Sequence, residues 1–355
     1  MHPKVTILWV NFNSWDFVDL TQKSLEAVKN LSYPNYEFIM IDNGSNDGSC
    51  EFLKDYLEKS QINFKIVRLN QNLGFTGGNN AGYSYRSKDS KYVVLLNNDA
   101  VPRKESLTEL VNIIEADEQL GAAQGIILNY DEKSIDTAGD YLSELLEATS
   151  FFQGQSPKSL RKPVFATSPD AAYSILRVTA IQKLYNQGDQ LFENYLFGHL
   201  DDHILGLKLW CNGFRVQVFP TIMAKHNRGT SINRVGILHA YLWIRNLLIL
   251  NEISNSRYKA MVRFLCFRRF SEALFSKIFS KDTNTLNMMS AVAKGFVDGI
   301  IIGRSRRRAG ERIDIYKAPI LRVSPLEAFA GAIVSTQLIS GHLERELNQI
   351  AVSQK

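Results

Sequence analysis

A single aspartate ends an apolar run in the first third of the chain. The stretch "YVVLLNNDAVP", residues 92–102, passes from five largely apolar residues through two asparagines to Asp99 and turns at Pro102. A carboxylate at the end of a buried strand can hold Mg²⁺ or Mn²⁺, because these hard ions take oxygen ligands and keep waters or phosphates in their shell. The same aspartate could instead form a turn or cap the following helix. This segment alone leaves both readings open.

A glycine-rich stretch, "NLGFTGGNNAG" at residues 72–82, could bring backbone close to a phosphate. It contains neither G-x-G-x-x-G nor G-x-x-x-x-G-K-[ST], so it predicts neither a dinucleotide site nor a P-loop. Without a fingerprint, the stretch indicates a tight turn that leads into a helix.

The elements that must position these residues alternate through the first hundred residues. Predicted strands cover 5–10, 36–41, 64–69 and 92–96, and predicted helices run from a cap at Ser14 or Asp16 to about Asn30, over 50–59 and over 79–87. The strands lack polar alternation, which is typical of parallel strands buried on both faces and joined by right-handed crossovers. We therefore predict an open, mostly parallel α/β sheet flanked by helices.

Polar residues follow every one of these strands. The exits read "NFN", "DNGSND", "NQNLGF" and "NNDA" in chain order. Asn, Asp and Gly are turn formers for their own reasons, so one polar exit means little. Ligands of open α/β sheets bind beyond the carboxyl ends of the strands, and four such exits in succession favour a polar ligand site there.

Length and composition predict a globular protein of two structural units. The chain has 355 residues, 45% of them hydrophobic, and three widely spaced cysteines that fit neither a disulfide framework nor a zinc site, so we expect a reducing compartment. The N-terminal apolar run is too short for a secretion signal. Apolar runs elsewhere are broken by charges such as Lys294 and Asp298, so we expect no membrane crossing.

The basic charge is concentrated in the C-terminal third. From Arg234 to Arg312, 15 Lys/Arg stand against 5 Asp/Glu, although the whole chain carries a net charge of only +5. We therefore predict two domains, 1–235 and a mainly helical 236–355. Apolar and basic residues mixed along helices favour docking on an anionic membrane surface, and a packed helical subdomain or a homo-oligomer interface remains the alternative. No nucleic-acid module accompanies "GRSRRRAGER", so we predict no nucleic-acid partner.

Six motifs together make the chain recognisable. They are "VTILWVNFNS", "FIMIDNGSNDGS", "NLGFTGGNNAG", "VVLLNNDA", "LFENYLFGHLDDHILGLKLWCNGFRV" and "AKHNRGTS". In their order and spacing they resemble the family-2 inverting glycosyltransferases with the GT-A fold, and most of all the rhamnosyl- and galactofuranosyltransferase-like branch. The resemblance covers about residues 4–250 and includes "YLWIRNLLIL". Each motif alone is weak, whereas six in order are specific.

The resemblance implies a nucleotide-sugar pocket at the strand exits. It places Asn11 and Phe12 against the nucleotide base and Asp42 against the base or ribose. The other residues that it implies in donor binding are Asn72, Gly74, Asn80 and Asn98.

The resemblance also implies a divalent cofactor, Mg²⁺ or Mn²⁺. Asp99 takes the metal-holding position of the D-x-D type, and His226 matches a histidine that completes the metal or diphosphate site in several relatives. Asn97 and Asn98 stand where the family often has an acid. A lone histidine after a strand is otherwise a packed or surface residue.

The catalytic base that the resemblance implies is Asp202, with Asp201 where glutamate is usual. Inversion needs one carboxylate opposite the leaving diphosphate, to accept the proton of the attacking hydroxyl. A hydrolase with two flanking carboxylates is excluded for this pair, because adjacent side chains point apart. Ile204 and Lys208 depart from the family pattern, which puts secondary contacts there in doubt.

The resemblance thus implies transfer of a sugar from a nucleoside diphosphate sugar (UDP, dTDP or GDP) to a hydroxyl of a glycan or lipid-linked glycan. We expect a cytoplasmic protein, peripheral on the membrane if the basic helices dock there. Residues 129–170 lack periodicity and are expected to shape the pocket. An inactive GT-A-like binding or scaffold module is the alternative. A nucleotidyltransferase is disfavoured, because "NFNSWDF" replaces its glycine-rich basic loop.

Overall fold

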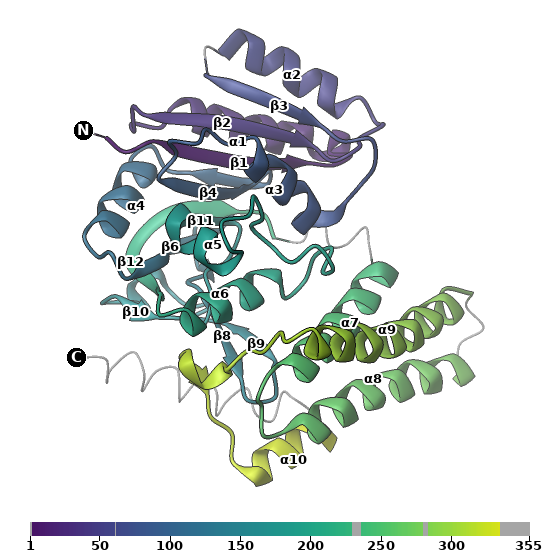
Figure 1. The fold of residues 1–355 in the computed structure, drawn as a ribbon. Helices are drawn as coiled ribbons and strands as arrows, with labels where there is room; N and C mark the ends of the chain where they lie inside the picture. The colour runs from purple at the N-terminus through teal and green to yellow at the C-terminus, as the bar shows by residue number, and fades with distance from the viewer. Residues whose placement is uncertain (1, 61, 229–235, 280–282, 334–355) are drawn as a thin grey trace. The chain divides into compact units, whose positions relative to one another are not determined.

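The computed structural model describes residues 2–60, 62–228, 236–279 and 283–333 (Figure 1). The chain divides into two compact units. The first unit comprises Met1–Asp140 and Ser150–Thr230, and the second comprises Tyr141–Thr149 and Ser231–Lys355. The domain boundary predicted after residue 235 falls at 229–235, outside the described residues.

One mixed sheet forms the centre of the first unit. In spatial order its strands are β10 (Val164–Phe165), β12 (Arg215–His226), β6 (Leu120–Asn129), β11 (Tyr173–Arg177), β4 (Tyr92–Asn97), β1 (Val5–Asn11), β2 (Tyr36–Asp42) and β3 (Phe64–Arg68). The four predicted strands are present and parallel, whereas β11 runs antiparallel to both β4 and β6. Two short strands pair beside this path, β5 (Ala100–Pro102) with β12 and β7 (Ile135–Thr137) with β6.

Strand register brings the polar exits together. Asn11 at the end of β1 pairs with Asp42 at the end of β2, and Val10 pairs with Asn97 at the end of β4. The apolar residues before them are almost fully buried, which explains why these strands show no polar alternation.

Helices cover both faces of this sheet. They are α1 (Val18–Lys29), α2 (Ser49–Ser60), α3 (Gly74–Ser84), α4 (Ser106–Glu115), α5 (Val178–Leu184) and α6 (Asp201–Cys211). One core joins Trp9 of β1 to side chains such as Leu25 of α1 and Leu53 of α2. A second core, on the other face, joins Leu8 to side chains such as Tyr83 of α3. Burial of apolar surface in both layers fixes the sheet between the helices.

Two predicted helix starts differ from the structure. A 3₁₀ turn, Trp15–Phe17, precedes α1, and the Ser14 hydroxyl donates to the Asn11 side chain at 2.5 Å instead of capping the helix. The helix predicted at 79–87 begins earlier, at Gly74. Gly74 has φ +74°, and a Cβ there would lie 2.0 Å from the Phe197 carbonyl oxygen, so tertiary packing requires glycine at this start.

The segment 129–170, which lacks periodicity in the sequence, forms several short strands. After β7 and before β10 come β8 (Asp140–Ser143), β9 (Ala148–Ser150) and a 3₁₀ turn at Pro157–Ser159. In the second unit β8 pairs in parallel with β13 (Ile320–Leu321), and β9 completes a small three-stranded sheet.

The second unit is mainly helical, as predicted. Its helices are α7 (Gly236–Ile253), α8 (Lys259–Phe279), α9 (Thr283–Arg308) and α10 (Pro325–Ile333), with a 3₁₀ turn at Ile315–Lys317. Glycines let α9 approach α7 closely: a Cβ on Gly295 would lie 2.6 Å from the Tyr241 carbonyl oxygen, and a Cβ on Gly299 would lie 2.6 Å from that of Arg245. Close backbone contact therefore holds this helix pair together.

A buried carboxylate ties the segment Tyr141–Thr149 into the second unit. Glu144 is fully buried and lies 2.8 Å from an Arg257 guanidinium nitrogen and 3.4 Å from one of Arg322, and it accepts the Val323 backbone N–H at 2.9 Å. A buried charge needs such partners, because desolvation otherwise outweighs its attractions.

One helix within the described residues is long and apolar enough to cross a membrane. It spans Leu286–Arg308 in α9 and has a mean hydropathy of 1.3 over its best window, although only 22% of that window is buried. Lys294 and Asp298 interrupt this stretch, so it contains no long uninterrupted apolar run. The expectation that the chain does not cross a membrane stays a prediction, because length and composition alone do not decide it.

Candidate functional site

Asn11 and Asp42 meet at the centre of the strand exits. The Asn11 amide nitrogen lies 3.4 Å from the Asp42 carboxylate and 3.1 Å from the Ser49 hydroxyl, and Asn11 itself is fully buried. Asp42 also lies 3.6 Å from the Arg68 guanidinium. The neighbouring Phe12 is 39% exposed, so of the predicted base contacts it is the side chain open to a ligand.

An asparagine that sequence reasoning missed fixes the next exit. The Asn43 amide donates to the Asn72 side chain and to the Gly74 carbonyl, each at 3.0 Å, and its oxygen accepts the Leu73 N–H at 3.0 Å. Asn72 also accepts the Gly74 N–H at 2.8 Å. These bonds hold predicted donor-site residues in one rigid turn.

Asn80 is engaged within the chain. Its amide donates to the Phe192 carbonyl and to Asn194, at 2.8 and 2.7 Å, and its oxygen accepts the N–H groups of Leu191 and Phe192. All four hydrogen-bonding positions of the side chain are therefore satisfied, which favours a role in holding the loop before α6. Asn98 lies buried in the turn between β4 and β5.

The two predicted metal ligands, Asp99 and His226, lie side by side. Antiparallel pairing of β12 with β5 places His226 opposite Ala100, next to Asp99. The His226 Nε2 atom is 3.0 Å from the Asp99 carboxylate, and both residues are buried. These two residues are 127 positions apart in the sequence, and strand pairing in the sheet brings them together.

His226 is oriented by a carboxylate that sequence reasoning missed. Asp136, at the centre of β7, lies 2.8 Å from the His226 Nδ1 atom. Burial opposes a charge on the ring, but hydrogen bonds to Asp136 and Asp99 outweigh it and raise the pKa of His226 to about 9. Burial likewise works to raise the pKa of Asp136, yet the bonds to His226 and Arg228 hold it below its usual range.

Arg228 extends this network from Asp136 to a further carboxylate, Asp170. Its guanidinium bonds Asp136 at 2.7 Å and Asp170 at 2.6 Å, and these partners outweigh burial and raise its pKa. Asp170 in turn accepts the Ala172 N–H at 2.8 Å. The result is a continuous chain of charge-assisted contacts that runs from Asp99 to Asp170.

Asp202 lies in the first turn of α6, directly after a strained loop. Phe197, His199 and Leu200 all have positive φ, between 58° and 69°, directly before the helix. Non-glycine residues pay strain there, and such strain concentrates at functional sites. The Asp202 side chain is 19% exposed and lies 2.7 Å from the His203 Nδ1 atom.

The electrostatic environment keeps Asp202 ionised. Burial works to raise its pKa, but the charges of His203 and Arg228 bring it below the usual range. Against burial, the charge of Asp202 raises the pKa of His203 to about 9. Burial, with the Asp202 charge added, raises the pKa of Asp201 to about 7. Of this acidic pair, Asp202 is therefore the stronger candidate for a deprotonated base.

A second group of side chains could share an ion. The ligand atoms of Asp140, Asp202 and His203 all lie within 4.8 Å of one another. Sequence reasoning placed the ion at Asp99 and His226 instead. Each of these two groups of residues offers carboxylate oxygen and imidazole nitrogen atoms, which can coordinate a divalent cation.

Comparison with known proteins finds a family similarity in the first half of the chain. Residues 6–174 match the model of the family described as glycosyl transferase family 2. Over just under half of the chain, this segment is similar to the family-2 glycosyltransferases. A curated relative, the poly-beta-1,6-N-acetyl-D-glucosamine synthase of Staphylococcus epidermidis, is 31% identical over 107 residues, which are 30% of this chain and 25% of that protein. The chain spans between a quarter and about half of the length of the curated relatives it matches.

Solved glycosyltransferases share the fold of this chain. Staphylococcus aureus TarS 1–349 in complex with UDP-GlcNAc has a TM-score of 0.51 at 15% identity, with 87% of this chain and 92% of that chain covered. The Pyrobaculum calidifontis mannosyltransferase PcManGT in complex with GDP-Man and Mn²⁺ has a TM-score of 0.51 at 13% identity, with 99% and 86% covered. These likenesses confirm the predicted GT-A fold.

Proposed function

We propose that this chain transfers a sugar with inversion from a nucleoside diphosphate sugar to a hydroxyl of a glycan or lipid-linked glycan. The match to the family-2 model supports the reaction class, and the sugar nucleotides named with TarS and PcManGT support the donor class. The observation that carries the proposal is the contact between Asp99 and His226. Arg228 bonds Asp136 behind His226, and its charge also acts on Asp202. The rhamnosyl- and galactofuranosyl-like branch remains our proposal for the finer class.

Asp202 acts as the general base in this proposal. Its lowered pKa keeps the carboxylate ready to accept the acceptor proton as the oxygen attacks. Partial exposure lets a hydroxyl reach it, whereas Asp201 is buried. His203 and Arg228 stabilise the carboxylate and do not compete for the reacting proton.

Asp99 and His226 would hold the divalent ion, Mg²⁺ or Mn²⁺. Asp136 fixes the imidazole through Nδ1 and leaves Nε2 facing Asp99, so this nitrogen and the Asp99 carboxylate are the groups that would hold the ion. A cation bound there would neutralise the departing diphosphate. Because His226 carries a raised pKa, the ion must replace a proton on binding.

The donor binds at the strand exits in this proposal. Phe12 offers an exposed ring to the base, and Asp42 offers a carboxylate held by Asn11 and Arg68. The remaining donor-site residues shape the pocket through the rigid turns that they form: Asn72, Gly74, Asn80 and Asn98. We place the protein in the cytoplasm, with a peripheral position on the membrane treated below.

A thermal-shift screen of UDP-, dTDP- and GDP-sugars with Mn²⁺ tests the donor class. A ligand that binds only the folded state raises the melting temperature, so one nucleotide should stand out. The donor that stabilises the protein is then incubated with candidate glycan acceptors, and release of free nucleoside diphosphate is measured. Stabilisation by none of the three nucleotides would contradict the proposal.

An inactive sugar-nucleotide-binding module is the second candidate. Asn97 and Ile204 stand where active relatives are expected to carry acids, which favours it. The two candidates differ in one readout: the binding module would be stabilised by the nucleotide sugar but would transfer no sugar to any acceptor.

A further inference from the structure

The outward face of α9 is unusually apolar. Leu286, Val297 and Ile301 are 51%, 53% and 61% exposed. Residues spaced by three and four lie on one face of a helix, so these side chains share a stripe with Ser290 and Lys294. Large exposed apolar side chains gathered in one place mark a contact surface.

These outward side chains contribute little to the packing of α9 on α7. The opposite face carries Val292 together with Gly295, Gly299 and Gly303, and all four residues are buried. The glycines make the close contacts with α7 already described. Packing within the described part of the second unit therefore does not explain the exposed apolar stripe.

Basic residues extend the same stripe toward its C-terminal end. Arg304 and Arg308 follow Ile301 at helical spacing and are exposed, as is Lys294 before Val297. Arg306 lies off this stripe and bonds Glu311 at 2.9 Å. Asp298 also lies off the stripe and accepts a hydrogen bond from the Tyr241 hydroxyl at 2.7 Å. The stripe thus presents apolar side chains between cationic ones.

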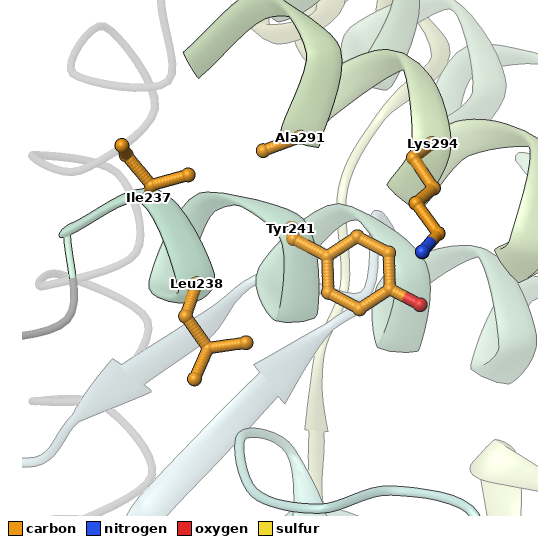
Figure 2. A pocket seen from close by; sticks show the side chains of 5 residues that line it. All are labelled: Ile237, Leu238, Tyr241, Ala291 and Lys294. Atoms are coloured by element: carbon orange, nitrogen blue, oxygen red, sulfur yellow. The ribbon is translucent and has the colours of Figure 1, made fainter. Parts of the chain in front are cut away.

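A shallow groove opens beside the N-terminal part of this stripe. It has a volume of about 450 Å³ and is lined by Ile237, Leu238, Tyr241, Ala291 and Lys294 (Figure 2). The Lys294 ammonium lies 5.7 Å from the centre of the Tyr241 ring. An apolar groove with one cation at its rim suits a hydrocarbon chain that carries an anionic head group.

We propose that the outward face of α9, with this groove, docks the protein on an anionic phospholipid bilayer. The apolar side chains enter the boundary between head groups and acyl chains, while Lys294, Arg304 and Arg308 meet the anionic heads. Charge complementarity selects the bilayer over a neutral apolar partner. Membrane docking itself does not depend on the proposed function. Only its purpose does, which is to bring the transferase to a lipid-linked acceptor.

The test is flotation of the full chain with phosphatidylcholine vesicles, with and without about 30% phosphatidylglycerol. Wild type should float with the anionic vesicles and lose binding in high salt. Val297→Glu/Ile301→Glu should reduce the partition coefficient at least tenfold. Arg304→Gln/Arg308→Gln should reduce it about 25-fold, because each basic residue is worth about fivefold. Equal binding by the wild type and both variants, or binding by none, overturns the proposal.

Controls separate docking from misfolding, self-association and catalysis. Tyr85→Glu changes an exposed aromatic of the first unit, 60% exposed, and should float like wild type. Circular dichroism melting verifies that each variant folds. Light scattering without lipid tests a second copy as the occupant: a dimer that Val297→Glu/Ile301→Glu dissociates, without vesicle binding, overturns the bilayer. Asp202→Asn should bind vesicles as wild type does, so docking and the transferase proposal fail separately.

Discussion

Asp202 is the residue whose surroundings are most specific to its proposed role. His203 and Arg228 keep its carboxylate charged, and the strained loop before α6 fixes where it stands. Asp202→Asn retains the shape but cannot accept a proton. We expect transfer to fall by about 10²–10⁴-fold, the usual contribution of a general base, with nucleotide affinity almost unchanged. Single-turnover transfer and calorimetric binding of the nucleotide measure the two effects.

Asp201→Asn is the matched control for that substitution. Asp201 adjoins Asp202 but is buried, and its raised pKa of about 7 leaves it partly protonated at neutral pH. Asp201→Asn should therefore reduce transfer far less than Asp202→Asn does. If both variants lose transfer equally, the pair acts as a structural unit and the base lies elsewhere.

Asp136 should control metal affinity without contacting the ion. Asp136→Asn removes the charge behind His226, and partners of this kind typically contribute 10- to 100-fold to metal affinity. We expect weaker nucleotide binding with Mn²⁺ and little change in the presence of a chelator. Asp99→Ala should show the same pattern more strongly. An equal loss with and without chelator would count against metal ligation, and Asp131→Asn, at an exposed carboxylate, is the control.

Glu37 gives a pH dependence of stability away from the site. Burial works against its charge, but hydrogen bonds from Ser87, Thr6 and Lys65 lower its pKa to about 2. A depressed carboxyl pKa stabilises the fold above the unfolded value of 4.5, and that stability is lost as pH falls from there toward 2.

Glu37→Gln should therefore unfold more easily at neutral pH than wild type. The difference should be about 1–2 kcal/mol, less than the shift alone implies because solvent screens the exposed Lys65 partner. Urea unfolding at several pH values measures it. The gap between the two proteins should close as pH falls below about 4, and a gap that persists at low pH would show that packing, rather than charge, is responsible.

Sequence reasoning found residues that belong to local patterns and missed those that do not. Asp99 and His226 follow strands and sit in motifs, and the structure brings them together. Asp136 and Asp170 lie in a segment without periodicity, so nothing local marked them. Arg228 could have been predicted, because it lies two residues after His226 in the motif "AKHNRGTS".

At the scale of elements, the close contact between α7 and α9 requires glycine on α9. A Cβ on Gly299 would lie 2.6 Å from the Arg245 carbonyl oxygen, so Gly299→Ala must push the helices apart. Overpacking of this kind costs about 1–3 kcal/mol. We expect a lower melting temperature by calorimetry.

Gly236→Ala is the control for that element. Gly236 opens α7, and a Cβ there meets nothing within 4 Å. The substitution should be neutral or slightly stabilising, because alanine favours helix more than glycine does. A comparable loss in both variants would mean that α7 and α9 are not held by close glycine contact.

Elements with a strong hydrophobic pattern were predictable, and those set by tertiary contact were not. The four predicted strands appear where apolar runs place them, although β3, at the edge of the sheet, is only partly buried. The start of α3 at Gly74 was missed, because glycine disfavours helix and the Phe197 backbone that requires it lies more than a hundred residues away. The antiparallel strand β11 also depends on long-range pairing.

At the scale of the whole molecule, the division into 1–235 and 236–355 stays a prediction, and one segment early in the chain groups with the second unit. The segment Tyr141–Thr149 belongs to the second unit because buried Glu144 pairs with Arg257 and Arg322, more than a hundred residues later. No local pattern reports such a pairing. The GT-A fold was predictable because its motifs recur in order along the chain.

The central claim is that the ion lies at Asp99 and His226, which leaves Asp202 free to act as base. An anomalous difference map from crystals grown with Mn²⁺ and the stabilising nucleotide tests it directly. The account predicts a manganese peak between the Asp99 carboxylate and the His226 Nε2 atom, against the diphosphate. A peak among Asp140, Asp202 and His203 would contradict it, because a carboxylate bound to the ion could not also take the acceptor proton.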